Sequence, residues 1–298
     1  MDLAQSNNPL LDAAATDADD MRLVAAIRTG DRAALEQLVN RHRRWIYNIA
    51  LRMLYHRDDA EDVTQEVLLK ALTKLDAFAA RSSFRTWLYR IVVNHVLNMK
   101  RRKGEEAGLT FVAYAEGLDG TAEEELPDPY TLPVDQQVII EEARLGCTAG
   151  MLLCLDREQR LVYVLGAIFG VSDVLGAELL EITRENFRQK LARARRDLHR
   201  FMDGQCGLIK ASNPCRCAKK ARGFMRAGYL DPANLLFANQ RVAAIRDVAP
   251  ARADALDELD AAYAEIQRAH PFQQGPDHVA AVRLLLDDGT FKGTLDLN

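Results

Sequence analysis

Hydrophobic residues recur at three- and four-residue spacing through the first hundred positions, the pattern of helices with one buried side. The first stripe follows Asp31, a residue type that caps helices. A second helix is expected to open at Asp58, with Glu61 completing a capping box, and a third near Ser83. The three expected core stripes are Leu35, Leu38, Trp45, Ile46, Ile49 and Met53; Ala60, Val63, Val67, Ala71 and Leu75; and Leu88, Val92, Val96 and Met99.

The helical pattern breaks between residues 104 and 135. Acidic residues gather there and three prolines interrupt any helix, so we interpret the segment as a linker. Helical spacing then returns, and caps are expected at Asp156, Ser172 and Thr183, the last opening a basic helix that ends near Met202. Two short helices, a tight turn and a basic helix predict a helix-turn-helix.

A cysteine-bearing stretch follows Gly204, and further helices are expected near residues 232–247, 252–269 and 278–287. The predicted fold class is all-α, with two helical modules, the second a helix-turn-helix, joined by a linker and followed by a helical C-terminal extension. The expected boundaries are 1–19 for a disordered N-terminus, 20–103 for the first module, 104–135 for the linker, 136–203 for the second module and 204–298 for the extension.

Composition and charge exclude several classes of protein. Of the 298 residues 48% are hydrophobic and the net charge is −4, which is typical of a folded protein and not of a basic nucleic-acid coat. The acidic first twenty residues lack the apolar stretch of a secretory signal, and the longest apolar run, 161–171, is shorter than the roughly 20 residues that span a bilayer. We therefore expect a cytoplasmic protein without a membrane segment, whose five cysteines are reduced or bind metal.

Two helices carry polar faces that suit a partner. On the second, the side opposite the apolar stripe carries Asp62, Gln65, Glu66 and Leu69, and its carboxylates could receive a basic partner. On the third, one face combines a stacking ring, amides and cations, as single-stranded DNA requires: Trp87, Arg90, Asn94, Asn98 and Arg101, followed by Arg102 and Lys103. The alternatives are a solvated helix face for the first set and a half-buried core aromatic with surface asparagines for the second.

Residues 182–226 carry thirteen lysines and arginines against three acids, a surplus of ten positive charges. Such a surplus supplies the salt-dependent attraction of a DNA-binding helix to phosphates. The residues at the start of that helix, Arg184, Asn186 and Arg188, are expected nearest the base edges.

Two blocks resemble the second conserved region of extracytoplasmic-function sigma factors: DAEDVTQEVLLKAL and FRTWLYRIVVNHVLNMKRRK. The later stretches LDREQRLVYVL and ENFRQKLARARRDL are similar to the fourth region of the same family, which holds its helix-turn-helix. The resemblance covers about residues 20–103 and 136–203.

The resemblance implies partners and roles. Core RNA polymerase would be held at the clamp helices of its largest subunit by Asp62, Gln65 and Glu66. The loop 76–83 with Trp87 and Asn94 would melt the minus-ten promoter element, and residues 101–103 would contact the DNA backbone. The duplex minus-thirty-five element would be read by Arg184, Asn186, Arg188, Gln189 and Arg193. An anti-sigma factor is a further partner of this class.

The chain departs from the family pattern in the helix-turn-helix. The usual acid and isoleucine after the first serine, and the usual glycine in the turn, are replaced by Leu175, Gly176 and Glu181. A reshaped turn is therefore expected, with the basic helix retained.

Three cysteines lie in CGLIKASNPCRC, and His199 lies seven residues before the first. These residue types are zinc ligands, so zinc is the one cofactor that the sequence suggests. Its expected ligands are Cys206, Cys215, Cys217 and His199. Because C-x8-C-x-C is not a usual finger spacing, a redox-sensitive thiol pair and simple packing stay as alternatives. Cys147 and Cys154 are expected in the core.

The sequence predicts a binding protein and not an enzyme, since it has no phosphate-cradling glycine loop, HExxH or nucleophile elbow. The leading hypothesis is a sigma factor that directs polymerase to promoters. A helix-turn-helix regulator with a metal- or redox-sensing cysteine segment is the alternative. The extension after Met202 is expected either to regulate activity in cis or to stabilise the modules.

Overall fold

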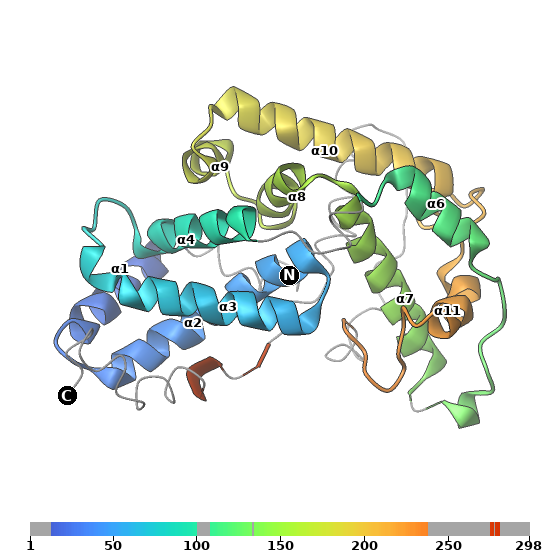
Figure 1. Cartoon of the computed structure of the whole chain (residues 1–298), viewed down its shortest axis with the longest axis horizontal. Coiled ribbons are helices and arrows are strands. Elements are labelled where there is room, and N and C mark those ends of the chain that lie inside the picture. Colours follow the sequence, from blue (N-terminus) through green and yellow to red (C-terminus); the bar gives the residue numbers. More distant parts are fainter. Residues whose placement is uncertain (1–12, 100–107, 133, 238–274, 277, 281–298) are drawn as a thin grey trace. The chain divides into compact units, whose positions relative to one another are not determined.

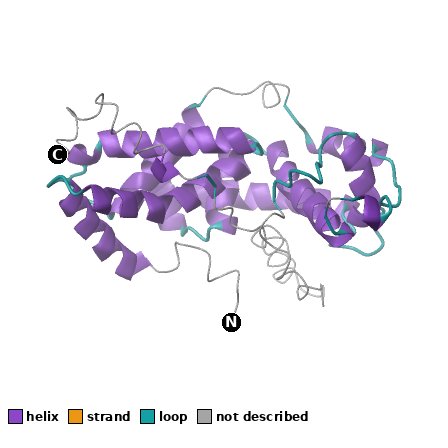
Figure 2. Cartoon of the chain, turned by 90° about the horizontal axis from the view of Figure 1, so that it is seen from below, coloured by secondary structure: helices purple, strands orange, loops and turns teal. Residues whose placement is uncertain are grey.

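A computed structural model describes residues 13–99, 108–132, 134–237, 275–276 and 278–280 of the chain (Figure 1). Apart from one isolated β-bridge, the described residues form helices and loops and no strand (Figure 2). The predicted all-α class is confirmed. The chain divides into two compact units. Unit 1 comprises Met1–Lys100, Val164–Arg188 and Phe272–Asn298, and unit 2 comprises Arg101–Tyr163 and Gln189–Pro271.

The helices of unit 1 are α1 (Ala13–Ile27), α2 (Arg32–Leu54), α3 (Arg57–Thr73), η1 (Leu75–Ala77), α4 (Phe84–Asn98), η4 (Val164–Ile168) and α9 (Asp173–Leu180). Those of unit 2 are α6 (Phe111–Gly120), η2 (Pro129–Thr131), α7 (Gln136–Gly150), η3 (Met151–Cys154), α8 (Arg157–Tyr163) and α11 (Cys217–Arg226). The basic helix α10 (Arg184–Gln205) gives its first five residues to unit 1 and the others to unit 2.

Most of the predicted caps are confirmed. Asp31 accepts hydrogen bonds from the first turn of α2, and the Ser83 hydroxyl accepts one from the amide of Thr86. Ser172 and Thr183 cap α9 and α10 in the same way. The capping box at Asp58 is wrong, because α3 begins one residue earlier and its N-cap, His56, makes no side-chain cap bond.

The core of unit 1 is built from the predicted stripes of α2, α3 and α4. All of those residues are buried except Met99, which is half-buried at the end of α4. Trp45 lies at the centre, with its ring 4.4 Å from that of Tyr89. Both residues are about 1% exposed, so this pair contributes strongly to the packing of α2 on α4.

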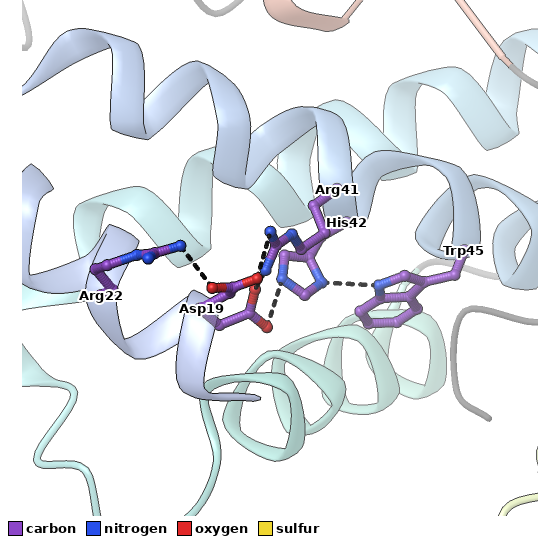
Figure 3. A network of polar contacts seen from close by, with 6 residues as sticks. Asp19, Arg22, Arg41, His42 and Trp45 are labelled. Atoms are coloured by element: carbon purple, nitrogen blue, oxygen red, sulfur yellow. Dashed lines mark hydrogen bonds and ion pairs between the residues drawn. The ribbon is translucent and has the colours of Figure 1, made fainter. Parts of the chain in front are cut away.

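Helix α1 is fastened to α2 by a polar network (Figure 3). The indole N–H of Trp45 donates to Nδ1 of His42, which places the imidazole proton on Nε2, 3.0 Å from Oδ2 of Asp20. Arg41 donates to the other oxygen of Asp20 at 3.0 Å. Because α1 starts at Ala13, the expectation of disorder up to residue 19 is wrong for residues 13–19.

The segment interpreted as a linker contains a helix, α6, that the sequence pattern did not predict. Its two glycines, Gly117 and Gly120, lower its helix propensity. Contacts within unit 2 compensate: the Tyr114 hydroxyl donates to the carbonyl of Cys147 at 2.8 Å, and the Tyr114 ring lies 5.7 Å from that of Phe201. Long-range packing therefore overrides a weak local signal.

The C-terminal extension packs on α7. Ala221 of α11 and Leu230 form one buried cluster with Ile139 and Ala143 of α7. The helix expected near 232–247 is wrong for residues 232–237, which form turns. The remainder of that helix, the one near 252–269, and most of the one near 278–287 lie outside the described residues, although 278–280 are helical.

Candidate nucleic-acid interface

The predicted acidic face of α3 lies on the side opposite the core. Asp62 and Glu66 are exposed, and Gln65 and Leu69 are half-buried. Oε2 of Glu66 lies 3.7 Å from Nζ of Lys70 and 3.7 Å from Nε2 of His95. Burial lowers the pKa of His95, and the ammonium of Lys70 lowers it further, so the imidazole is neutral near pH 7. The face therefore keeps negative charge that a basic partner could meet.

The mixed face of α4 is present as predicted. Trp87, Arg90, Asn94 and Asn98 follow one another along this helix, with both asparagines exposed. The Trp87 ring is half-buried, 5.3 Å from Phe78 and 5.5 Å from Phe84, so part of it belongs to an aromatic cluster and part faces solvent. Arg101, Arg102 and Lys103 lie outside the described residues.

The loop before α4 is held by an arginine that the sequence pattern did not single out. Arg28, the residue directly after α1, donates to the carbonyl of Leu75 at 3.0 Å and to that of Phe78 at 2.6 Å. Within this loop Ala80 has a φ of 53°, a left-handed conformation that non-glycine residues rarely adopt. The loop is thus fixed at one end and strained in its middle.

The helix-turn-helix keeps its turn despite the departures from the family pattern. Glu181 adopts the left-handed conformation that closes α9, with φ 55° and ψ 39°. A Cβ at Gly176 would meet the ring of Phe187 at 2.3 Å, so glycine is required where α9 and α10 approach. A non-glycine residue therefore supplies the left-handed conformation at the end of α9, and the expectation of a reshaped turn stays a prediction.

The exposed side of α10 carries Arg184, Gln189 and Arg193, with Asn186 half-buried. Arg188 donates to Oδ2 of Asp173 in α9 at 2.5 Å. Arg90 of α4 likewise donates to Oε1 of Glu178 in α9 at 2.5 Å. One predicted DNA-binding residue in each helix is therefore held by a carboxylate of α9.

Some of the basic residues in 182–226 form hydrogen bonds and ion pairs inside unit 2. They therefore do not extend the predicted DNA surface. Lys220 of α11 donates to the carbonyl of Thr121 at 2.7 Å, and Arg222 to that of Glu125 at 3.0 Å. Arg222 and Arg226 also pair with the Glu124 carboxylate. The basic side of α11 thus neutralises acidic residues within the linker, and these cations are already paired inside unit 2.

The cysteines meet in unit 2. Cys206, Cys215 and Cys217 line one small cavity together with Cys147, the side chain expected in the core. His199 does not line it, so the four cysteines around the cavity differ from the predicted set of zinc ligands. Burial raises the pKa of each of these thiols. Neighbouring thiols add to this effect at Cys147, Cys215 and Cys217, and the pKa of Cys217 reaches about 12. Cys154 lies outside the cavity lining.

Comparison with known proteins decides the family. A family model described as Sigma-70 region 2 matches residues 38–106. The chain is 30% identical over 178 residues to the ECF RNA polymerase sigma factor SigW of Bacillus subtilis, an alignment covering 59% of this chain and 93% of SigW. The chain belongs to the extracytoplasmic-function (ECF) sigma factor family.

A second curated relative agrees with this assignment. The chain is 32% identical to the RNA polymerase sigma factor CnrH of Cupriavidus metallidurans, over 62% of this chain and 94% of CnrH. A solved structure of CnrH in complex with the cytosolic domain of CnrY is similar at 26% identity and a TM-score of 0.45, over 62% of this chain and 97% of that one. The ECF alignments leave more than a third of this chain uncovered. No described helix is long and apolar enough to cross a bilayer.

Proposed function

We propose that this ECF sigma factor, whose family role is to initiate transcription, binds core RNA polymerase through α3 and reads promoter DNA through α4 and α10. The observation that carries the proposal is the mixed face of α4. It places a partly exposed indole, two exposed amides and an arginine on one side of a helix whose other side is buried.

The α3 face suits the polymerase. Asp62 and Glu66 are exposed on a rigid helix whose opposite side, including Val63 and Val67, is buried in the core of unit 1. Carboxylates on such a scaffold attract a basic surface without the loss of backbone entropy. The clamp helices of the largest polymerase subunit are the basic partner that the family resemblance implies.

The α4 face suits the melted minus-ten element. Extruding a base from a duplex costs a few kcal/mol, which stacking on an aromatic ring and preformed polar contacts can offset. Trp87 supplies the ring, Asn94 and Asn98 the amides, and the Arg28-held loop forms the adjoining wall. Residues 101–103 complete the site as phosphate contacts.

The α10 helix suits the duplex minus-thirty-five element. Arg184, Asn186, Arg188, Gln189 and Arg193 lie toward its N-terminal end, the part that a recognition helix places against base edges. The ion pair of Arg188 with Asp173 does not prevent this role, and that of Arg90 with Glu178 does not prevent the role of α4. The Arg188 and Asp173 side chains are 62% and 27% exposed, and those of Arg90 and Glu178 are 40% and 45% exposed, so each pair is worth about 0–1 kcal/mol and can be exchanged for phosphate.

The protein acts by positioning polymerase and performs no reaction of its own, and it works in the cytoplasm, where polymerase and promoters meet. An anti-sigma factor is a further partner that the family resemblance implies. The extension after Met202 regulates activity in cis: through α11 it holds both α7 and the end of the linker.

Run-off transcription with purified core polymerase tests the proposal. Promoter-specific transcripts should require the protein and should vanish with Asp62→Arg, because the reversed charge repels a basic partner. Asp119→Arg, the same change at an exposed acid of α6, is the matched control and should leave the transcripts unchanged. Binding to duplex promoters without polymerase, and no added transcripts, would favour the helix-turn-helix regulator instead.

A further inference from the structure

Four thiols that are far apart in sequence line one cavity of unit 2. Cys147 comes from α7, Cys206 directly follows α10, and Cys215 and Cys217 lie at the start of α11. An isolated β-bridge pairs Cys206 with Cys215. The cluster therefore joins α7 of the second module to the C-terminal extension.

The loop that carries three of these cysteines is held in shape by its own polar contacts. The amide of Asn213 donates to the carbonyls of Met202 at 3.3 Å, Asp203 at 2.9 Å and Cys206 at 3.0 Å. Asn213 is 9% exposed, so these bonds are shielded from water. They satisfy carbonyls at the end of α10 and fix the direction in which the chain leaves that helix.

A glycine allows the loop to close. A Cβ at Gly207 would lie 2.4 Å from the carbonyl oxygen of Cys215 and 2.1 Å from Nη1 of Arg216. The amide of Gly207 donates to that same carbonyl at 3.2 Å. The backbone on the two sides of the loop is therefore in contact, which keeps Cys206 and Cys215 next to each other.

The cavity has the size and surroundings of an ion site. Its volume is about 20 Å³, which exceeds the roughly 10–15 Å³ that one water molecule needs. Arg144 lines it as well, and Arg216 follows Cys215 directly. Arg144 already pairs with Glu141, and Arg216 donates to nearby backbone carbonyls. The two guanidinium groups would therefore offset only part of the double negative charge that four thiolates and one divalent cation leave.

We propose that Cys147, Cys206, Cys215 and Cys217 hold one thiophilic metal ion of zinc type, which fastens the C-terminal extension to α7. Four sulfur ligands with tetrahedral geometry are the usual set of a structural zinc site, and a disulfide would use only two of them. In the part of the chain that the structure describes, no three possible ligands lie at the spacing of an assembled metal centre. Binding therefore requires the thiols to turn inward by a change of staggered rotamer.

This ligand set differs from the one predicted by sequence spacing alone, because the fourth ligand is Cys147 and not His199. Cys147 lies on α7, whereas His199 lies on α10, so only the new set links the extension to a separate helix. The metal would act together with the α7 contacts of Ala221 and Leu230.

Metal content of the full-length protein, purified under reducing conditions and dialysed, tests the proposal. About one zinc per chain is expected for the natural protein, because four thiolates hold one ion. Cys147→Ser should lower that content several-fold, while His199→Ala should leave it unchanged. Cys154→Ser is the matched control, because Cys154 lies in the same unit outside the cavity, and it should also leave the content unchanged.

Measurements on the natural protein keep the test independent of whether the variants fold. Titration with an organomercurial should release the zinc as cavity thiols react, and Co²⁺ in its place should give the absorption bands of tetrahedral thiolate coordination. Metal-free protein that takes up neither ion would overturn the proposal. A Cys206–Cys215 disulfide in protein purified without reductant, with no metal bound after reduction, would overturn it in favour of a redox pair.

Discussion

Two residues, one within α9 and one at its end, set the geometry of the helix-turn-helix. Gly176 lies where the ring of Phe187 leaves no room for a Cβ, and Glu181 takes the left-handed conformation that ends α9. Phe187 is 1% exposed, so its ring cannot move aside without loss of packing. The close approach of the two helices therefore depends on one missing methyl group.

We predict that Gly176→Ala lowers the free energy of unfolding by about 1–3 kcal/mol, because the added methyl overpacks the contact with Phe187. Gly204→Ala in α10 is the control, since nothing lies within 4 Å of its Cβ position. It should raise stability or leave it unchanged. Denaturant titrations of both variants measure the difference, and equal midpoints would contradict the tight contact.

At the scale of elements, α1 is held by the buried carboxylate of Asp20. Burial raises the pKa of this group, but hydrogen bonds and charges from His42 and Arg41 outweigh that effect and hold the pKa below its usual 3.8. The carboxylate therefore stabilises the fold above about pH 4. That stabilisation is lost as the pH falls through the lowered pKa.

We predict that Asp20→Asn costs about 2 kcal/mol near pH 7, because a buried charged partner of His42 and Arg41 is removed. The difference from the natural protein should shrink below pH 4. Asp19→Asn is the control, since that side chain is 42% exposed, and its effect should stay within about 0.5 kcal/mol. Tryptophan fluorescence reports on this unit, because both tryptophans of the chain, Trp45 and Trp87, belong to it.

Docking of the extension on α7 depends on another buried carboxylate. Oε1 of Glu142 accepts hydrogen bonds from the amides of Leu236 at 2.7 Å and Phe237 at 3.1 Å. We predict that Glu142→Gln speeds hydrogen exchange of these two amides by about 10-fold or more, since hydrogen bonds to a charged group contribute roughly 1.5–3 kcal/mol. Glu141→Gln, which instead removes a charge facing Arg144, should leave that exchange unchanged.

The features that the sequence predicted and those that it missed differ in how far apart along the sequence their contacting residues lie. The cap at Ser83 and the stripes of α2, α3 and α4 arise from residues within one or two turns, so periodicity is enough to find them. Arg28 binds carbonyls 47 and 50 residues away, and Lys220 binds one 99 residues away. Cys147 meets Cys217 through the packing of α11 on α7 (Figure 1). Such contacts have no signature in local spacing.

At the scale of the whole molecule, basic residues divide into two groups. Those at the start of α10 face solvent, and those of α11 pair with the acidic end of the linker. Only the first group is expected to release counterions when the protein binds DNA. The net charge of residues 182–226 therefore overstates the number of cations available to DNA, because some of them pair with acids elsewhere in the chain.

We predict that Arg184→Ala and Arg193→Ala each weaken promoter binding by the holoenzyme and reduce the slope of log affinity against log salt by about 1. Arg222→Ala and Arg226→Ala should leave that slope unchanged, because both side chains pair with Glu124. Filter binding or anisotropy across a salt series measures the slopes. A reduced slope for the α11 variants would place that helix on the DNA after all.

The packing of α11 on α7 also governs how the chain matures during synthesis. Ile139 and Ala143 leave the ribosome about eighty residues before their partners Ala221 and Leu230. Until those partners emerge, the apolar side of α7 is open to chaperones and to other nascent chains. A gene shortened at codon 202 would make that exposure permanent, so its product is expected to aggregate even where each remaining helix is able to form.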